Sequence, residues 1–119
     1  KQLMGRHVDG RVGGMVGTHT HVATADEQIL PGGTGFQCDL GMTGPFESIL
    51  GRKIDAVLEA TLHGVPLPFQ VATEDVRLCG TWLDLDKQSG LCCNIGRIVL
   101  RESTLTEYLQ NKSEARRVL

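Results

Sequence analysis

Short apolar runs divided by glycine organise the first part of the chain. Residues 12–16, Val-Gly-Gly-Met-Val, are apolar throughout, which predicts a buried strand over residues 11–16. The residues before it indicate a helix that ends near Val8 and is closed by Asp9-Gly10. A second short strand is predicted at residues 34–40, and the glycine-rich segment between them at residues 24–33 is expected to form a loop.

A helical pattern follows in the middle of the chain. Apolar and small residues recur at spacings of three and four over residues 53–63, which predicts a helix with one buried stripe: Ile54, Val57, Leu58, Thr61 and Leu62. Gly64 is expected to end this helix. Upstream, Pro45 followed by Glu47 is typical of the first turn of a helix and predicts a short helix there.

The last part of the chain changes to the alternation of strands. A strand is expected from Leu67 to Val71. Residues 76–85 and 91–100 flank the sequence Asp-Lys-Gln-Ser-Gly, which predicts a β-hairpin. Residues 104–109 have a brief helical pattern, and the polar residues at 111–117 are expected to be frayed or disordered.

Composition limits the classes of protein to which this chain can belong. The chain has 119 residues, of which 40% are hydrophobic and 22% charged, as in a soluble globular domain. The net charge is −2 without a block of like charges, so neither duplex nucleic acid nor a membrane surface is an expected partner. No apolar run approaches the roughly 18 residues of a transmembrane helix. The four cysteines form no C-x-x-C pair, which favours reduced thiols and a cytoplasmic location.

Two histidines carry the clearest chemistry. His19 and His21 follow the first predicted strand, and if strand geometry continues they point the same way with Cα atoms about 6–7 Å apart. This spacing suits one shared metal ion or two neighbouring ions. The alternative is two polar residues on a loop or an edge strand. His7 lies inside the predicted first helix. His63 lies at the end of another helix, where it is expected to be either a cation favoured by the helix dipole or a solvated residue.

Four sequence blocks around these histidines resemble one family. In order they are Gly17-Thr18-His19-Thr20-His21-Val22, Thr24-Ala25-Asp26-Glu27, Leu30-Pro31-Gly32-Gly33-Thr34, and Asp39-x-Gly41-Met42-Thr43-Gly44-Pro45. Together they resemble the C-terminal half of YmdB-type bacterial metallophosphoesterases, which are relatives of the calcineurin-like phosphoesterases. The resemblance covers residues 1–102 and leaves residues 103–119 as a C-terminal tail.

The resemblance implies a fold and an activity. The expected fold class is α/β, part of a sandwich of two mixed β-sheets flanked by helices. The activity implied is that of a phosphodiesterase for 2′,3′-cyclic nucleotides with two divalent or trivalent metal ions (Fe, Mn or Zn). His19 and His21 would each bind one ion, and the proteins of this family tend to self-associate.

The resemblance also implies that a part is missing. Family members are more than twice as long, and their N-terminal half supplies acidic and amide ligands and the histidine that acts as general acid. We therefore expect this chain, which begins at Lys1, to be a fragment that needs the N-terminal half of the same protein. No catalytic residue is expected within the chain itself.

Four further residues near the histidines each have two possible interpretations. Asp39 or Asp26 either accepts a hydrogen bond from a metal-binding imidazole or stabilises a local turn. Thr43 and Gly44 either open a helix whose N-terminal amides bind phosphate, or form a purely structural turn.

Two other functions compete with the enzyme. One is a catalytically inactive regulatory or scaffold homologue, which would lack the ligands of the N-terminal half. The other is a structural zinc module that combines Cys92 with His19 and His21.

Overall fold

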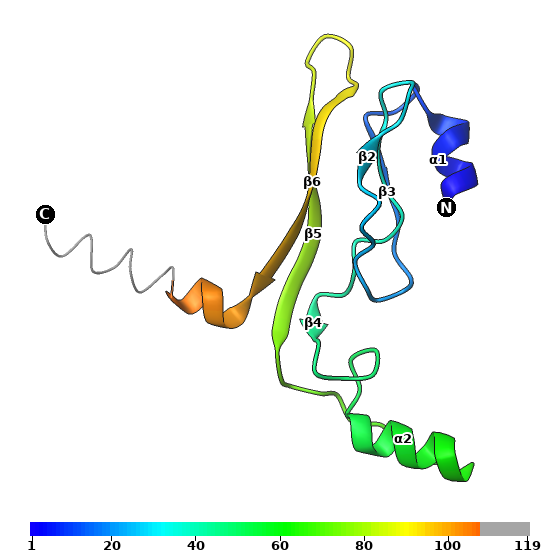
Figure 1. Cartoon of the computed structure of the whole chain (residues 1–119), viewed down its shortest axis with the longest axis vertical. Helices are drawn as coiled ribbons and strands as arrows, with labels where there is room; N and C mark the ends of the chain where they lie inside the picture. Colours follow the sequence, from blue (N-terminus) through cyan, green and yellow to red (C-terminus); the bar gives the residue numbers. More distant parts are fainter. Residues whose placement is uncertain (108–119) are drawn as a thin grey trace, which may run out of the picture. The chain divides into compact units, whose positions relative to one another are not determined.

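The chain forms a mixed α/β structure, as predicted. The computed structural model describes residues 1–107 (Figure 1). Its elements in chain order are α1 (Gln2–Val8), β1 (Gly14–Val16), β2 (Gln28–Ile29), β3 (Gly35–Gln37), β4 (Gly44–Pro45), α2 (Ile54–His63), β5 (Val76–Leu85) and β6 (Cys92–Arg101). Residues 102–107 are helical, and the remainder of the predicted tail lies outside the described residues.

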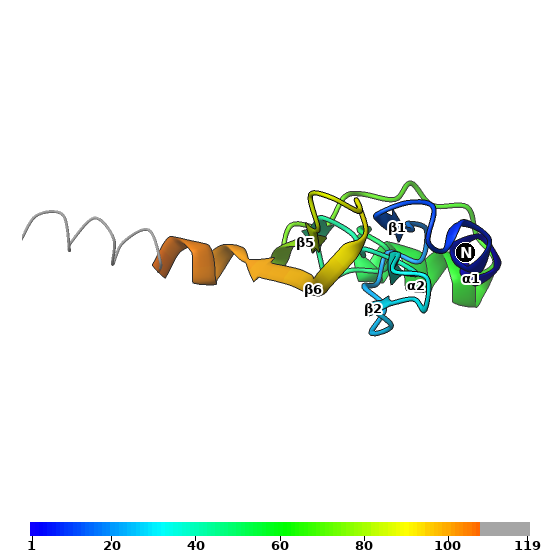
Figure 2. The ribbon, with the colours of Figure 1, turned by 90° about the horizontal axis from the view of Figure 1, so that it is seen from above.

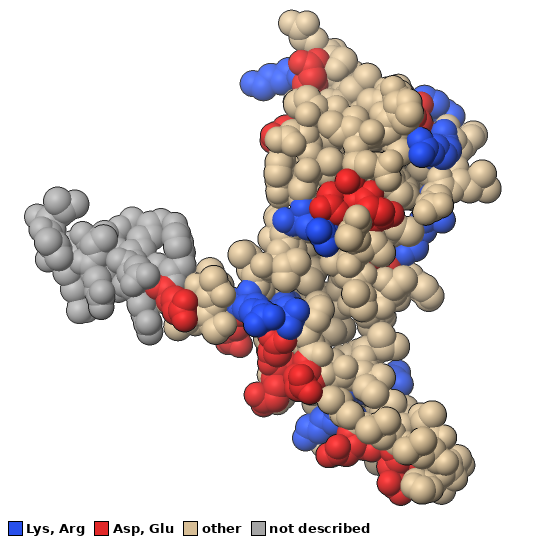
Figure 3. Space-filling model, viewed as in Figure 1, with Lys and Arg blue, Asp and Glu red and all other residues tan. Residues whose placement is uncertain are grey.

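The chain divides into two compact units. The first contains residues 1–42 and 79–99, and the second contains residues 43–78 and the chain from residue 100. No helix within residues 1–107 is long and apolar enough to span a membrane. Acidic and basic side chains are interspersed on the face shown in Figure 3.

A small mixed sheet organises the first unit. Its strand order is β1-β3-β2, with β1 parallel and β2 antiparallel to β3. The strands predicted at residues 11–16 and 34–40 are both present but shorter. The expectation that the first is buried is wrong for the described structure, because Gly14 and Val16 are exposed. The prediction of an uninterrupted loop at residues 24–33 is wrong, because Gln28 and Ile29 pair with β3.

The sheet lies between α1 and residues 79–99 of the β5–β6 hairpin, the part that belongs to this unit. In both views α1 and this part of the hairpin lie on opposite sides of the sheet (Figures 1 and 2). On one side the ring of Phe36 lies so close to Gly5 of α1 that a β-carbon there would be 2.6 Å from the ring. On the other side a β-carbon on Gly35 would be 2.4 Å from the Leu83 side chain. The apolar core of this unit contains Leu30, Phe36 and Cys92.

Three polar residues are also fully buried in this unit: Thr34, Gln37 and Asp39. Buried polar atoms need hydrogen-bond partners. The Thr34 hydroxyl accepts a bond from the Gly10 N–H at 2.9 Å and donates one to the Val12 carbonyl at 2.8 Å. The Asp9 carboxylate accepts a bond from the Gly32 N–H at 2.9 Å. The block at residues 30–34 is therefore fastened to the turn after α1.

Two elements predicted in the second unit differ in the structure. The predicted helix at Pro45 is wrong, because Gly44 and Pro45 form β4 and pair with Arg77 and Val76 of β5. The predicted strand at residues 67–71 is also wrong. Only Val71 takes part in a bridge there, with Arg52.

Helix α2 confirms the predicted helix at residues 53–63, and Gly64 closes it with φ 65°. The expectation that its apolar stripe is buried is wrong for the described structure. No residue of α2 is buried, and the Leu62 side chain is 74% exposed. The predicted hairpin at residues 76–100 is confirmed, and Asp86 accepts hydrogen bonds within its loop.

Candidate functional site

The histidine segment leaves β1 through a closely packed glycine. The Gly17 N–H donates to the Gln37 carbonyl at 3.1 Å, and the Gly17 carbonyl accepts from the Leu40 N–H at 2.8 Å. A β-carbon on Gly17 would lie only 2.3 Å from the carbonyl oxygen of Cys38. Only glycine permits this approach, so the sequence itself brings the histidine segment against the end of β3.

His19 and His21 lie in a bend and not in a strand. Strand β1 ends at Val16, so the expectation that strand alternation sets their directions is wrong. Both side chains are exposed, and φ is 149° at His19 and 64° at His21. Residues other than glycine rarely adopt positive φ, and each such residue costs about 1–3 kcal/mol. The surrounding structure must therefore hold this bend in place.

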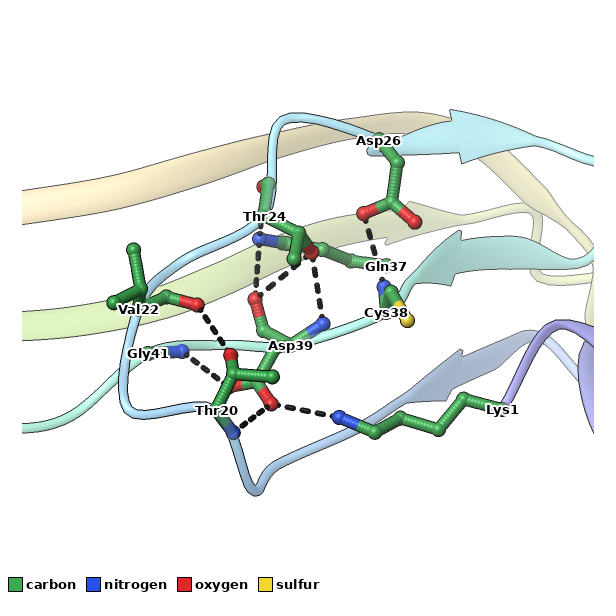
Figure 4. A network of polar contacts seen from close by, with 9 residues as sticks. All are labelled: Lys1, Thr20, Val22, Thr24, Asp26, Gln37, Cys38, Asp39 and Gly41. Carbon is green, nitrogen blue, oxygen red and sulfur yellow. Dashed lines mark hydrogen bonds and ion pairs between the residues drawn. The ribbon is translucent and has the colours of Figure 1, made fainter.

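The Asp39 carboxylate is the main support of the bend (Figure 4). One carboxylate oxygen accepts from the Thr20 N–H at 2.7 Å and from the Lys1 ammonium at 2.7 Å. The other accepts from the Gly41 N–H at 3.0 Å. Burial by itself raises the pKa of Asp39, but the hydrogen bonds from Lys1, Thr20 and Gly41 outweigh it and hold the pKa well below its usual 3.8. Asp39 is therefore a buried anion.

A second layer of hydrogen bonds fixes the position of Asp39 itself. Its N–H donates to the Thr24 hydroxyl at 2.9 Å. The Gln37 amide nitrogen donates to the carbonyls of Thr24 and Asp39 at 3.0 and 2.9 Å. The Gln37 amide oxygen accepts a bond from the Thr81 hydroxyl of β5. The end of the bend is fixed too, since the Met42 N–H donates to the His21 carbonyl at 3.1 Å.

The supporting residues differ from the predictions in detail. Within residues 1–107 the Asp39 carboxylate binds backbone N–H groups and Lys1 and does not bind an imidazole, so the turn interpretation describes its contact with Gly41. Asp26 accepts from the Cys38 N–H at 3.1 Å and so ties the segment before β2 to the end of β3. Thr43 and Gly44 do not lie at a helix N-terminus, which removes the basis for predicting phosphate binding there.

Metal-ligating side chains are sparse in the described structure. Within residues 1–107 no three His, Cys, Asp or Glu side chains come together in a group that could hold a metal ion. The Cys92 thiol is buried and donates to the Asn94 carbonyl at 3.1 Å. The described residues therefore do not join Cys92 with the two histidines.

Sequence reasoning missed Lys1, Thr24 and Gln37 as parts of this site. The available signal was Gln37, a polar residue inside the short apolar strand Gly35–Gln37. A polar side chain at such a position must find buried partners. Which partners it finds depends on the approach of three separate segments.

Comparison with known proteins identifies the family. Residues 1–98 match the family model described as YmdB-like protein. This chain belongs to the YmdB-like family. The chain is 40% identical over 102 residues to the 2′,3′-cyclic-nucleotide 2′-phosphodiesterase of Bacillus subtilis (strain 168), covering 86% of this chain and 39% of that protein.

Two solved structures resemble the fold of this YmdB-like chain. A hypothetical protein from Thermus thermophilus is 38% identical with a TM-score of 0.79, over 86% of this chain and 40% of its own. A phosphatase from Mycoplasma pneumoniae is 28% identical with a TM-score of 0.79, over 88% of this chain and 39% of its own. The chain thus spans about two-fifths of the length of these relatives.

Proposed function

We propose that this chain is the C-terminal part of a metal-dependent phosphodiesterase with two metal ions, and that His19 and His21 each bind one ion. The observation that carries the proposal is the conformation of the bend. Two exposed imidazoles flank Thr20, both have positive φ, and hydrogen bonds at Gly17, Thr20 and His21 hold the backbone. Backbone strain supported in this way is typical of functional sites.

The two histidines fit the chemistry of a metal site. Within the described residues neither ring is hydrogen-bonded or ion-paired to the protein, so the ring nitrogens are free to act as ligands. Neutral imidazole binds Fe, Mn or Zn without adding charge, which leaves a bound cation strongly electrophilic. When bound, two cations would neutralise the phosphoryl oxygens and activate water near neutral pH. The histidines' own task is to place the ions on a rigid bend.

Two imidazoles are too few for such a site, so the proposal requires further ligands from outside this chain. About three-fifths of the length of each relative lies outside the part that this chain matches. The described structure also has uncovered surface where more chain would fit. Strand β1 is at the edge of its sheet, and parallel strands are normally covered on both faces. Leu3 of α1 and Val22 beside the histidines are 86% and 61% exposed.

The proposed substrate class is a phosphodiester, and more specifically a 2′,3′-cyclic nucleotide. This assignment is supported by the name of the Bacillus subtilis relative and by the match of residues 1–98, which contain all four sequence blocks, to the family model. Residues 17–24, which include both histidines, contain no Phe, Tyr or Trp side chain that could stack on a base. Selection of the base would then depend on the rest of the protein.

The test uses the full-length protein and single alanine variants. His19→Ala and His21→Ala should each reduce bound metal from two ions to one per subunit and lower kcat by several orders of magnitude. His7→Ala and His63→Ala are the matched controls, because both are exposed histidines on helices and both should keep two ions and normal turnover. Retention of two ions and near-normal turnover in the His19 and His21 variants would refute the proposal.

A further inference from the structure

We propose that Asp39 is a positioning residue for metal binding, and that it acts through the backbone N–H of Thr20. This inference rests on the proposed function of His19 and His21. Its basis is the position of the hydrogen bond. Thr20 is the residue between the two histidines, and its N–H lies 2.7 Å from a carboxylate oxygen of a fully buried aspartate.

The bond at Thr20 controls both histidines at once. The amide that it fixes joins His19 to Thr20, and His21 follows one residue later. Hydrogen bonds to an ionised acceptor are shorter and about twice as strong as neutral ones. Without that acceptor, the backbone at His19 and His21 can relax from positive φ to the ordinary negative region. Such a rotation would swing both imidazoles away from the directions that the bend now gives them.

A carboxylate suits this position because each hydrogen-bond partner of its two oxygens within residues 1–107 is a donor. These partners are the N–H groups of Thr20 and Gly41 and the ammonium of Lys1. Two carboxylate oxygens accept from all of them. Asparagine has the same size but only one acceptor oxygen, so its NH₂ group would face at least one donor. Asp39→Asn should therefore weaken at least one of these hydrogen bonds without a large change in side-chain volume.

Asp39 is also well anchored, which a positioning residue needs to be. Its own N–H is fixed by Thr24 and its carbonyl by Gln37. These bonds join the strand end to the segment after the histidines and leave the carboxylate as the part that reaches Thr20 (Figure 4). Through these hydrogen bonds, the position of the end of β3 fixes the position of the bend that carries the two histidines.

Asp26 provides a control for the loss of a carboxylate charge in this unit. Its carboxylate accepts a backbone N–H bond from Cys38, the residue next to Asp39 in the chain, at 3.1 Å. It makes the same kind of contact in the same unit, yet none of its hydrogen bonds reaches Thr20. Asparagine at either position removes one carboxylate charge from this unit, although at position 26 it keeps an acceptor oxygen for the Cys38 N–H. An effect of the lost charge alone would appear in both variants, whereas positioning through Thr20 would appear only in Asp39→Asn.

The experiment measures the Kd for Mn²⁺ in the full-length protein by competition with a chelator. Asp39→Asn should weaken binding by about 10–100-fold, the range seen when a group that orients a metal ligand is lost, and Asp26→Asn should leave the Kd unchanged. In a His21→Ala background, Asp39→Asn should weaken the remaining ion less than in wild type, because part of its effect passes through His21. An unchanged Kd in Asp39→Asn, or an equal loss in Asp26→Asn, would overturn the inference.

A second variant keeps the test decisive if Asp39→Asn does not fold. Replacing Thr20 by its α-hydroxy analogue turns the His19–Thr20 amide into an ester, which removes the N–H donor and leaves every side chain unchanged. The ester should also weaken Mn²⁺ binding at least tenfold, and a wild-type Kd would overturn the inference. If His19→Ala and His21→Ala keep both ions, the proposed function itself has failed. If those variants lose metal while the ester and Asp39→Asn do not, only the role of Asp39 has failed.

Discussion

Gly17 offers a quantitative test of how the histidine bend is built. In Gly17→Ala the new methyl group would lie 2.3 Å from the Cys38 carbonyl oxygen and 2.5 Å from the Lys1 side chain. The lysine chain can move away, but the carbonyl belongs to the backbone that follows β3. The two segments must therefore separate.

The expected cost follows from these contacts. Overpacking of this kind costs about 1–3 kcal/mol. Separation also weakens two hydrogen bonds, Gly17 N–H to Gln37 and Leu40 N–H to Gly17, each worth about 1 kcal/mol. The total is about 3–5 kcal/mol, a large fraction of the roughly 5–15 kcal/mol that stabilises a domain. Mn²⁺ binding should weaken in parallel, since the bend begins at Gly17.

The assay is denaturant unfolding of the full-length protein, with Gly80→Ala as the control. Gly80 lies in β5, and no atom of residues 1–107 is within 4 Å of the position that its β-carbon would take. Gly80→Ala should therefore stay within about 1 kcal/mol of wild type. Equal unfolding free energies for Gly17→Ala and Gly80→Ala would show that the close approach at Gly17 does not exist.

Three further predictions follow from the same structure. Thr34→Val should lower the free energy of unfolding by about 1–3 kcal/mol, because the Gly10 N–H and the Val12 carbonyl lose their buried partner, whereas the exposed Thr61→Val should change it little. Since the pKa of Asp39 is held below 3.8, its stabilisation is present above about pH 4 and is lost as the pH falls through the lowered folded-state pKa. The metal-free Asp39→Asn protein should accordingly lose less stability than wild type between about pH 5 and pH 2, and equal losses would contradict this. The 119-residue chain alone should not hydrolyse bis-p-nitrophenyl phosphate with added Mn²⁺, and turnover abolished by a chelator would contradict the need for ligands from outside it.

Local sequence signals predicted part of the local structure. The hairpin at residues 76–100 followed from alternation and from a loop that ends in glycine, and Gly64 was recognised as the end of α2. The signal at Pro45 was misleading because pairing of β4 with β5 outweighs the preference of proline for a first helical turn. The periodicity of apolar residues identified the apolar face of α2 but could not show whether another element covers it. Burial depends on the elements that pack against the helix, and the sequence of the helix does not specify them.

The site was only partly readable for the same reason. The histidine pair and the Asp-x-Gly block stand out in the sequence, and the contact of Asp39 with Gly41 was one of two predicted alternatives. The contact of Asp39 with Thr20 joins residues 19 positions apart. It forms because Gly17 allows two chain segments to approach each other closely. Nothing in the sequence pattern indicates this approach. Long-range polar contacts therefore had to come from the structure.

The central claim is that His19 and His21 bind two different metal ions, and anomalous X-ray diffraction from crystals of the full-length protein tests it most directly. Data collected at the absorption edge of the bound metal should show two peaks close together. Each peak should lie at bonding distance, about 2.0–2.1 Å if the metal is zinc, from a nitrogen of only one of the two rings. Peaks remote from both imidazoles, or both rings bound to a single ion, would contradict the account.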